Sequence, residues 1–306
     1  MKKITVSTST FGAYDRAPLE SLEARGYTVV LNPFGRTLSE QEVIDLAGGS
    51  VGLIAGTESL SLGVLNSLSD LKVIVRLGTG MDNVDMEAAE KAGIAVTNTP
   101  DGPVLAVAEL TIALALSLLR NIALMNGHMK GGTWEKRMGN LLFGKRVGII
   151  GYGKIGMKVG ELFQKLGCDI SFFDPVVEAS FPGATKLSLV ELLKTSDIVT
   201  IHASGGDAPI IGKEETAVVK EGAWLINCSR GTLIDETALI DALQSGRIRG
   251  AALDVFSREP YSGPLTALDN VILTPHIGSY ALEARVKMEH DAVQLLLAGL
   301  DGLNGK

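Results

Sequence analysis

A glycine-rich segment in the middle of the chain has the residue types and the spacing of a phosphate-binding loop. It follows an apolar run, 147–150, that is typical of a buried strand, and it leads into a helical pattern. Gly151 suits a tight turn, Gly153 lets the backbone approach a pyrophosphate, and Gly156 lets the helix pack closely on the strand. The N–H groups at the start of that helix can bind phosphate oxygens. The neighbours that we expect to contact the same ligand are Tyr152, Lys154 and Ile155.

An acidic residue, Asp174, ends the next predicted strand, 18 residues after Gly156. A carboxylate at this place can accept hydrogen bonds from both hydroxyls of an adenosine ribose, and it repels a 2′-phosphate. The pattern therefore predicts NAD rather than NADP as the cofactor. The alternative is a glycine turn of purely structural use, followed by a surface aspartate.

Strand and helix patterns alternate along the whole chain, which is typical of βαβ units and parallel sheets. β-Branched runs predict strands at 4–6, 27–31, 51–55 and 72–76 in the first part, with helices at 18–25 and 39–47 between them. Ser39 and Glu42 have the spacing of a capping box. In the second part, strands are predicted at 147–150, 169–173, 198–202, 223–228, 251–255 and 271–273.

The second α/β block is inserted into the first. A long helix is predicted from about 103 to 130, six strands follow, and one helix at about 281–298 closes the chain. We predict an α/β fold with two doubly wound parallel sheets: a Rossmann NAD-binding domain, 99–280, inserted into a flavodoxin-like substrate domain, 1–98 plus 281–306. The two crossings form a hinge, and a small ligand is expected in the cleft between the domains.

The composition excludes several other classes of protein. Of 306 residues, 46% are hydrophobic, which excludes a disordered chain, and the net charge of −7 offers no basic face for nucleic acid. The longest apolar stretch, 104–119, is interrupted by Glu109 and is too short to cross a bilayer. The N-terminus lacks the apolar core of a signal peptide, and two cysteines do not make a disulfide framework. We expect a cytoplasmic protein with no nucleic-acid or membrane partner.

Five further short motifs are spread over the chain: RLGTGMDNVD (76–85), VTNTP (96–100), INCSRG (226–231), ALDV (252–255) and TPHIG (274–278). Together with the glycine loop, their order and spacing resemble those of the D-isomer-specific 2-hydroxyacid dehydrogenases, especially the phosphoglycerate dehydrogenase-like branch. The resemblance covers essentially the whole chain. It implies an NAD-dependent enzyme that transfers a hydride to or from C2 of a small 2-oxo or D-2-hydroxy acid, without a metal ion.

The resemblance implies catalytic roles for Arg230, Glu259 and His276. The oxygen on C2 must gain or lose a proton, and histidine suits this transfer because its unperturbed pKa is about 6.5. Glu259 would orient the imidazole and favour its protonated form, and Arg230 would hold the substrate carboxylate and polarise the carbonyl. The alternatives are a surface salt bridge for Arg230 and a helix cap for Glu259. His128 and His290 lie outside the motifs, and we expect structural roles for them.

The same resemblance assigns ligand contacts in both domains. In the first, the loop 78–80 would offer the backbone N–H groups of Thr79 and Gly80 to the substrate carboxylate, unless it is an ordinary turn. The predicted substrate-binding residues are Arg76, Gly78, Thr79, Gly80 and Arg230. In the second, Asp254 would contact the nicotinamide amide. The other cofactor contacts are predicted at His202, Ala203, Cys228 and Ser229.

Two departures from the family pattern leave the substrate open. The loop 203–211 lacks the usual Pro-Leu-Thr run, which puts its cofactor contacts in doubt. Phosphoglycerate dehydrogenases usually place arginines near the first-domain cleft. Arg76 stands in one such position, but Glu58 in the preceding loop would repel a phosphate unless a cation offsets it. The candidates are 3-phosphoglycerate with 3-phosphohydroxypyruvate, glyoxylate, hydroxypyruvate and other small 2-oxo acids.

The resemblance also implies an alternative function and a homodimeric assembly. The family includes NAD-sensing transcriptional corepressors that keep the scaffold and the catalytic residues, so a non-enzymatic binding protein is the alternative to a dehydrogenase. A homodimer is expected by analogy, through the helical segment 103–130 and the arm after it, which includes Trp134.

Overall fold

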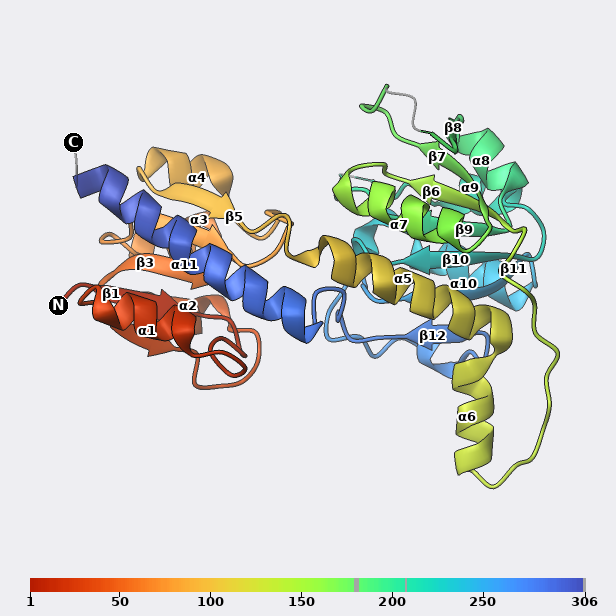
Figure 1. The fold of residues 1–306 in the computed structure, drawn as a ribbon, viewed down its shortest axis with the longest axis horizontal. Coiled ribbons are helices and arrows are strands. Elements are labelled where there is room, and N and C mark those ends of the chain that lie inside the picture. The colour runs from red at the N-terminus through yellow and green to blue at the C-terminus, as the bar shows by residue number, and fades with distance from the viewer. Residues whose placement is uncertain (179–181, 207, 305–306) are drawn as a thin grey trace. The chain divides into compact units, whose positions relative to one another are not determined.

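Alternating strands and helices build two parallel sheets in this chain, and the predicted α/β fold class is confirmed. The computed structural model describes residues 1–178, 182–206 and 208–304. The chain divides into two compact units: unit 1 comprises Met1–Pro103 and Ser279–Lys306, and unit 2 comprises Val104–Gly278. Each unit has its own sheet (Figure 1). Each also has its own hydrophobic cores.

The sheet of unit 1 has the strand order β2-β1-β3-β4-β5, which is the flavodoxin-like order. Its strands are β1 (Lys3–Val6), β2 (Thr28–Leu31), β3 (Ser50–Ala55), β4 (Val73–Arg76) and β5 (Ala95–Asn98). The first four agree with the predicted strands to within one residue at each end. The edge strand β5 was not predicted as a strand, because it is short and only partly buried.

Helices cover both faces of this sheet. On one face, α1 (Ala17–Ala24) and α11 (Leu282–Asn304) pack their apolar residues, such as Leu22 and Met288, against β1, β3 and β4. On the other face lie α2 (Glu40–Ala47), α3 (Leu62–Ser67) and α4 (Met86–Lys91). Ser39 and Glu42 form the predicted capping box at the start of α2. Because both faces are covered, β1, β3 and β4 read as nearly continuous apolar runs.

The sheet of unit 2 has the order β12-β11-β10-β9-β6-β7-β8. Its strands are β6 (Arg146–Ile150), β7 (Asp169–Phe173), β8 (Ala184–Lys186), β9 (Ile198–Ile201), β10 (Ala223–Asn227), β11 (Ile248–Leu253) and β12 (Val271–Leu273). All six predicted strands are present; β11 begins and ends earlier than expected, and the short polar edge strand β8 was missed. From β6 the chain first adds β7 and β8 on one side, and then adds β9 to β12 on the other side. The point between β6 and β9 is therefore a topological switch point, where such sheets bind nucleotides.

Two helical layers enclose the sheet of unit 2. One contains α5 (Pro103–Arg120) and α7 (Lys154–Lys165), and the other contains α8 (Leu189–Thr195), α9 (Lys213–Val218) and α10 (Glu236–Gln244). Short 3₁₀ turns, η1 (Gly231–Leu233) and η2 (Pro264–Ala267), follow β10 and β11. The prediction that the stretch 104–119 is too short to cross a bilayer is wrong, because the helix α5 that contains it is long and apolar enough by length and composition; half of that helix is buried inside the protein, as in a core helix.

The single long helix predicted at about 103–130 is wrong. The structure has two helices, α5 and α6 (Ile122–Lys130), separated at Asn121, whose φ of 53° is left-handed. Asparagine adopts this conformation more readily than most residues. The Asn121 amide also donates a hydrogen bond to the carbonyl of Met138 at 3.4 Å. The apolar pattern continues across the break, so helical periodicity alone does not reveal it.

Candidate functional site

The glycine loop joins the end of β6 to the start of α7, and two of its glycines are required by close packing. Gly151 has φ of 88°, and a Cβ there would lie 2.5 Å from the backbone nitrogen of Ala203. A Cβ on Gly156 would overlap the carbonyl oxygen of Gly151. Gly153, the N-cap of α7, has nothing within 4 Å of a Cβ position. The open side of Gly153 therefore fits a pyrophosphate bound against the start of the helix.

Asp174 connects the loop to the end of β7. Its Oδ2 accepts the N–H of Tyr152 at 2.7 Å, and its Oδ1 accepts the N–H groups of Val176 and Val177 at 2.9 and 3.0 Å. Partial burial would raise the pKa of Asp174, but these three bonds and the nearby charge of Lys186 lower it. An ionised carboxylate has about four accepting positions, so one remains for a ribose hydroxyl rather than the two that the sequence predicted. Asp174 therefore also fixes the glycine loop, a role that its spacing did not predict.

The other predicted contacts around the loop differ in burial. Tyr152 is buried and stacks on Phe172 with 4.1 Å between ring centroids, so its ring packs inside the protein. Lys154 and Ile155 lie in the first turn of α7. His202 and Ala203 follow β9, the neighbour of β6, and burial lowers the pKa of His202 to about 3. The Nε2 atom of His202 lies 2.8 Å from the Thr200 hydroxyl, and the low pKa of His202 disfavours acid catalysis by its imidazolium.

The predicted proton-transfer pair is formed in unit 2. The Nδ1 atom of His276 and the Oε2 atom of Glu259 lie 2.7 Å apart, and both side chains are more than one-third exposed. Partial burial would raise the pKa of Glu259, but the hydrogen bond and charge of His276, the Phe256 N–H and the charge of Arg230 lower it. Glu259 is therefore an ionised partner that can stabilise an imidazolium while Nε2 is left for a substrate.

His276 lies on a turn built around the carboxylate of Asp254. Asp254 is 1% exposed, and it accepts hydrogen bonds from the Thr274 hydroxyl at 2.6 Å and from the N–H groups of Ile277 and Gly278, each at 2.8 Å. The carbonyl of Asp254 accepts the N–H of His276 at 2.9 Å. Burial raises the pKa of Asp254 despite these bonds. His276 has φ of 55°, a strained conformation that these contacts hold in place.

Arg230 follows β10 on a loop that is held in place by Asn227 and Gly231, two residues to which the sequence analysis gave no role. The Asn227 amide donates to the carbonyl of Arg230 at 2.8 Å, and its oxygen accepts the N–H and the hydroxyl of Ser229 at 3.0 and 2.8 Å. A Cβ on Gly231 would overlap the carbonyl carbon of Phe256, so only glycine lets this loop meet the loop of Glu259. The role of Asn227 could have been inferred from its place in the sequence, because it is a polar residue at the end of the apolar strand β10. Nothing local indicated the packing role of Gly231.

Cys228 lies on the same loop but is not a nucleophile. It is buried, and burial, with a smaller contribution from the charge of Asp254, raises the pKa of its thiol to about 12. Together with Ser229, it stays a predicted lining residue of the cofactor site. Across the described parts of the chain, no three His, Cys, Asp or Glu side chains are grouped as a metal site.

In unit 1, the loop after β4 presents the predicted anion-binding backbone. Gly78 has φ of 136°, and its N–H donates to the buried Thr99 hydroxyl at 2.8 Å, so it is not available to a ligand. Among the residues that the structure describes, no acceptor contacts the N–H groups of Thr79 and Gly80. The guanidinium of Arg76 lies over the open side of Gly78, and its Nη1 donates to the Leu77 carbonyl at 2.6 Å.

The carboxylate of Glu58, which the sequence places in the loop after β3, is buried in unit 1. Glu58 is 2% exposed and accepts the N–H of Gly56 at 3.0 and 3.1 Å and the hydroxyl of Ser7. It holds together the loops after β1 and β3, and its lone pairs are directed to the protein. The altered loop 203–211 includes residue 207, which lies outside the described residues; its end is anchored at Ile211, whose N–H donates to the Leu233 carbonyl at 3.0 Å.

Residues 112–278, which include the glycine loop, Arg230, Glu259 and His276, match the family described as D-isomer specific 2-hydroxyacid dehydrogenase, NAD binding domain. The chain belongs to this family. The cofactor of the matched domain is NAD, in agreement with the prediction from Asp174.

Similar proteins extend the likeness to the whole chain. A D-3-phosphoglycerate dehydrogenase of Methanocaldococcus jannaschii is 40% identical over 258 residues, which are 81% of this chain and 49% of that protein. The chain spans about half the length of the curated relatives it matches. A Thermus thermophilus protein of known structure is 34% identical, with a TM-score of 0.91 over 98% of this chain and 97% of that one. A glyoxylate reductase of Paecilomyes thermophila is 28% identical, with a TM-score of 0.84 over 96% and 93% of the two chains.

Two glycine variants separate cofactor binding from packing. Gly156→Ala should lower the melting temperature by several degrees, because its Cβ would overlap the carbonyl of Gly151. Gly153→Ala should leave the melting temperature unchanged and weaken NADH binding about tenfold or more, because its methyl group would meet only the ligand. Thermal unfolding and NADH fluorescence titration measure the two effects. Equal NADH affinity in Gly153→Ala and the wild type would contradict the pyrophosphate role.

Asp174→Asn tests the basis of cofactor choice. The substitution keeps one accepting oxygen for the N–H groups of Val176 and Val177, loses the acceptor of the Tyr152 N–H and removes the negative charge, so the preference for NADH over NADPH should fall about tenfold or more. Dissociation constants for the two cofactors, from fluorescence titration, give this ratio without an activity assay. Asp169→Asn, at the opposite end of the same strand, is the control. An unchanged ratio in Asp174→Asn would show that another residue sets the preference.

Proposed function

We propose that this chain is an NAD-dependent dehydrogenase that transfers a hydride between the nicotinamide and C2 of a small D-2-hydroxy acid or 2-oxo acid. The observation that carries the proposal is the ion pair of His276 with an ionised Glu259, beside the loop of Arg230 and in the same unit as the glycine loop. A purely structural protein would require none of these features together. The D-3-phosphoglycerate dehydrogenase relatives support the same reaction class.

The chemistry divides among the residues of the chain. When bound along the glycine loop, NAD supplies or accepts the hydride. In the direction of reduction, Nε2 of protonated His276 donates a proton to the C2 oxygen, and the carboxylate of Glu259 stabilises the imidazolium until the transfer. The guanidinium of Arg230 binds the substrate carboxylate and polarises the carbonyl. In oxidation, His276 accepts the same proton.

For the substrate, we propose a small 2-oxo acid, with 3-phosphohydroxypyruvate, glyoxylate and hydroxypyruvate as the first compounds to test. Within unit 1, the N–H groups of Thr79 and Gly80 can bind a carboxylate. The carboxyl group of Glu58 is buried and accepts hydrogen bonds from the protein, but burial does not remove the repulsion between a carboxylate and a phosphate, so phosphorylated and unphosphorylated acids both belong in the test. The similar proteins include both a phosphoglycerate dehydrogenase and a glyoxylate reductase.

We further propose a cytoplasmic homodimer that assembles through α6 and the arm after it. Both cysteines are free thiols, which fits a reducing compartment. Residues 122–143 expose an unusual number of large apolar side chains: Ile122, Met129, Trp134, Met138, Leu141 and Phe143. Trp134 is 78% and Met138 94% exposed. Exposed apolar side chains in such number are typical of a protein–protein contact.

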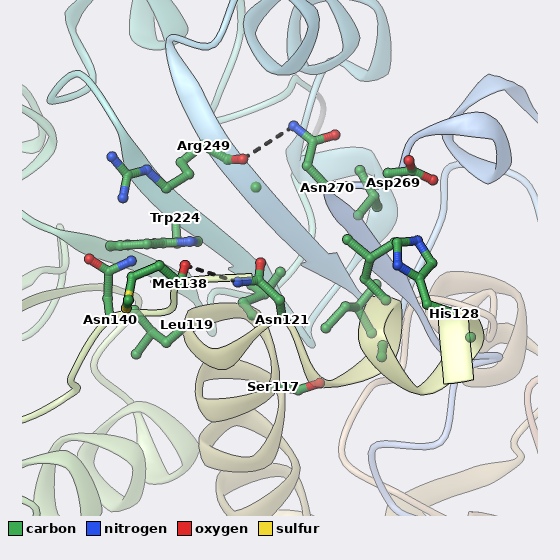
Figure 2. A pocket seen from close by; sticks show the side chains of 17 residues that line it. Ser117, Leu119, Asn121, His128, Met138, Asn140, Trp224, Arg249, Asp269 and Asn270 are labelled. Atoms are coloured by element: carbon green, nitrogen blue, oxygen red, sulfur yellow. Dashed lines mark hydrogen bonds between the residues drawn. The ribbon is translucent and has the colours of Figure 1, made fainter. Parts of the chain in front are cut away.

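A cavity beside this arm supports a symmetric contact. It has a volume of about 480 Å³ and lies between α5, α6 and the first residues of β10, β11 and β12. Figure 2 shows Trp224 in its wall, with Arg249 on one side and Met138 and Asn140 on the other. The glycine loop follows the opposite, carboxyl end of β6, so the cavity is not part of the cofactor site. A second copy, with the same arm and cavity, can make the contact twice.

The proposed reaction is tested by NADH oxidation with a panel of 2-oxo acids and by three variants. His276→Ala and Glu259→Gln should lower kcat about a hundredfold or more, because general acid–base catalysis contributes that much, and should leave NADH affinity within about twofold. His290→Ala is the matched control, since His290 also contacts a carboxylate, Asp15, at 2.7 Å but lies in α11. If the wild type turns over no member of the panel, the corepressor-like alternative is favoured. Equal losses of kcat and NADH affinity would exclude a proton-transfer role for His276.

The proposed dimer is tested by sedimentation velocity. The wild type should sediment as a dimer, and the double variant Trp134→Asp/Met138→Asp should sediment as a monomer, because burying two carboxylates in the contact is strongly unfavourable. Val190→Asp, on an exposed face of α8, is the control and should stay dimeric. A monomeric wild type, or a double variant that remains a dimer, would exclude this interface.

A further inference from the structure

The loop that carries Glu259 has little secondary structure to hold it. It runs from Phe256 to Gly263, between the end of β11 and η2, and its residues 257–260 are all exposed. Within the loop, the Phe256 N–H donates to Oε1 of Glu259 at 3.1 Å. A catalytic carboxylate on an exposed loop requires anchors elsewhere, since a misplacement of about 1 Å can reduce the rate about a hundredfold.

The first anchor is at the beginning of the loop. The backbone of Phe256 lies directly against Gly231, where no Cβ fits. This contact fixes where the chain leaves the sheet, next to the loop of Arg230. It leaves the end of the loop, after Glu259, without support from Gly231.

The second anchor is Tyr261, two residues after Glu259. Its hydroxyl donates a 2.5 Å hydrogen bond to Oε1 of Glu236, in the first turn of α10, and accepts the N–H of Leu265 at 3.3 Å. Its ring stacks on Phe256 with 4.4 Å between centroids and 20° between planes. Tyr261 therefore ties the end of the loop both to its beginning and to a helix that packs on the sheet.

We propose that Tyr261, held by Glu236, is the positioning residue that keeps Glu259 against His276. The inference rests on the proposed function, because only proton transfer at His276 requires that pair. Tyr261 does not touch the reacting atoms; it acts through the loop. Glu259 itself faces the imidazole of His276 and the charge of Arg230, and Tyr261 faces the carboxylate of Glu236.

The hydroxyl of Tyr261 does not lose its proton in the pH range of an activity assay. Partial burial and the carboxylate of Glu236 raise the pKa of Tyr261 to about 12. The hydroxyl therefore keeps its proton and its donor role at neutral pH. A change in the pH profile of a Tyr261 variant would accordingly report on the ionisation of Glu259 and His276, not on that of Tyr261.

The test compares Tyr261→Phe with Glu236→Gln and with Tyr14→Phe, an exposed tyrosine in unit 1. Tyr261→Phe keeps the stacked ring and loses the hydrogen bond to a charged partner. We expect kcat to fall about five- to twentyfold, with an unchanged KM for NADH. The acid limb of kcat/KM should move to higher pH, because the contacts that lower the pKa of Glu259 loosen. Glu236→Gln keeps an accepting oxygen and should have a smaller effect; Tyr14→Phe should have none.

A second measurement does not depend on activity. Arg258 is exposed and precedes Glu259, so trypsin cleavage after Arg258 reports how firmly the loop is held. The cleavage rate should rise about tenfold in Tyr261→Phe and stay unchanged in Tyr14→Phe. If the wild type is active and Tyr261→Phe keeps its rate, its pH limb and its cleavage rate, the proposal is wrong. A lower melting temperature with an unmoved pH limb would limit Tyr261 to stability and would also overturn it.

The outcomes separate this inference from the proposed function. Wild-type protein that turns over no 2-oxo acid would refute the dehydrogenase, whatever the variants do. Active wild type with an unaffected Tyr261→Phe would refute only the positioning role. Faster cleavage together with a shifted pH limb in an active enzyme would establish that role.

Discussion

The carboxylate of Asp254 organises the turn on which the proposed chemistry depends. It is buried at the end of β11 and accepts one hydroxyl and two N–H groups from 274–278, the turn that carries His276. A buried carboxylate is unfavourable unless its hydrogen bonds are made, so the turn and the charge stabilise each other. The strained φ of His276 persists because the turn is held at both ends, and the imidazole then meets Glu259 at 2.7 Å.

The order of strands in unit 2 brings the remaining groups to the same edge. The glycine loop follows β6, His202 follows β9, Arg230 follows β10, Glu259 follows β11 and His276 follows β12, and these five strands are neighbours in that order. In a parallel sheet, all carboxyl ends lie at one edge, so five short loops can line one site. The amino ends of the same strands are at the other edge, where Trp224 and Arg249 line the cavity that we propose for subunit contact.

Local patterns in the sequence were good predictors wherever the relevant interaction is itself local. The turn at Gly151, the capping box of α2 and most strands depend on residues within a few positions, and they were found. The break at Asn121 was missed, because one left-handed residue interrupts a helix without changing its apolar period. The short edge strands β5 and β8 were missed because partly exposed strands lack the apolar run that marks buried ones. The burial of Glu58 was not predicted, because its partner Ser7 is 51 residues away in the chain.

Residue types and spacing were sufficient to predict the α/β class, the glycine loop and NAD as the cofactor, and the candidate catalytic residues were predicted from the resemblance of the motifs to a known family. These depend on backbone geometry, charge and motif order, all of which are visible along the chain. The roles of Asn227, Gly231 and Tyr261, and the second role of Asp174, emerged only from the folded protein. Each of them acts on a loop through contacts whose meaning depends on three-dimensional packing: Gly231 meets Phe256, and Tyr261 meets Glu236 across 25 positions of sequence. No local pattern specifies such pairs, because the packing of separate loops on one sheet edge determines which side chains meet.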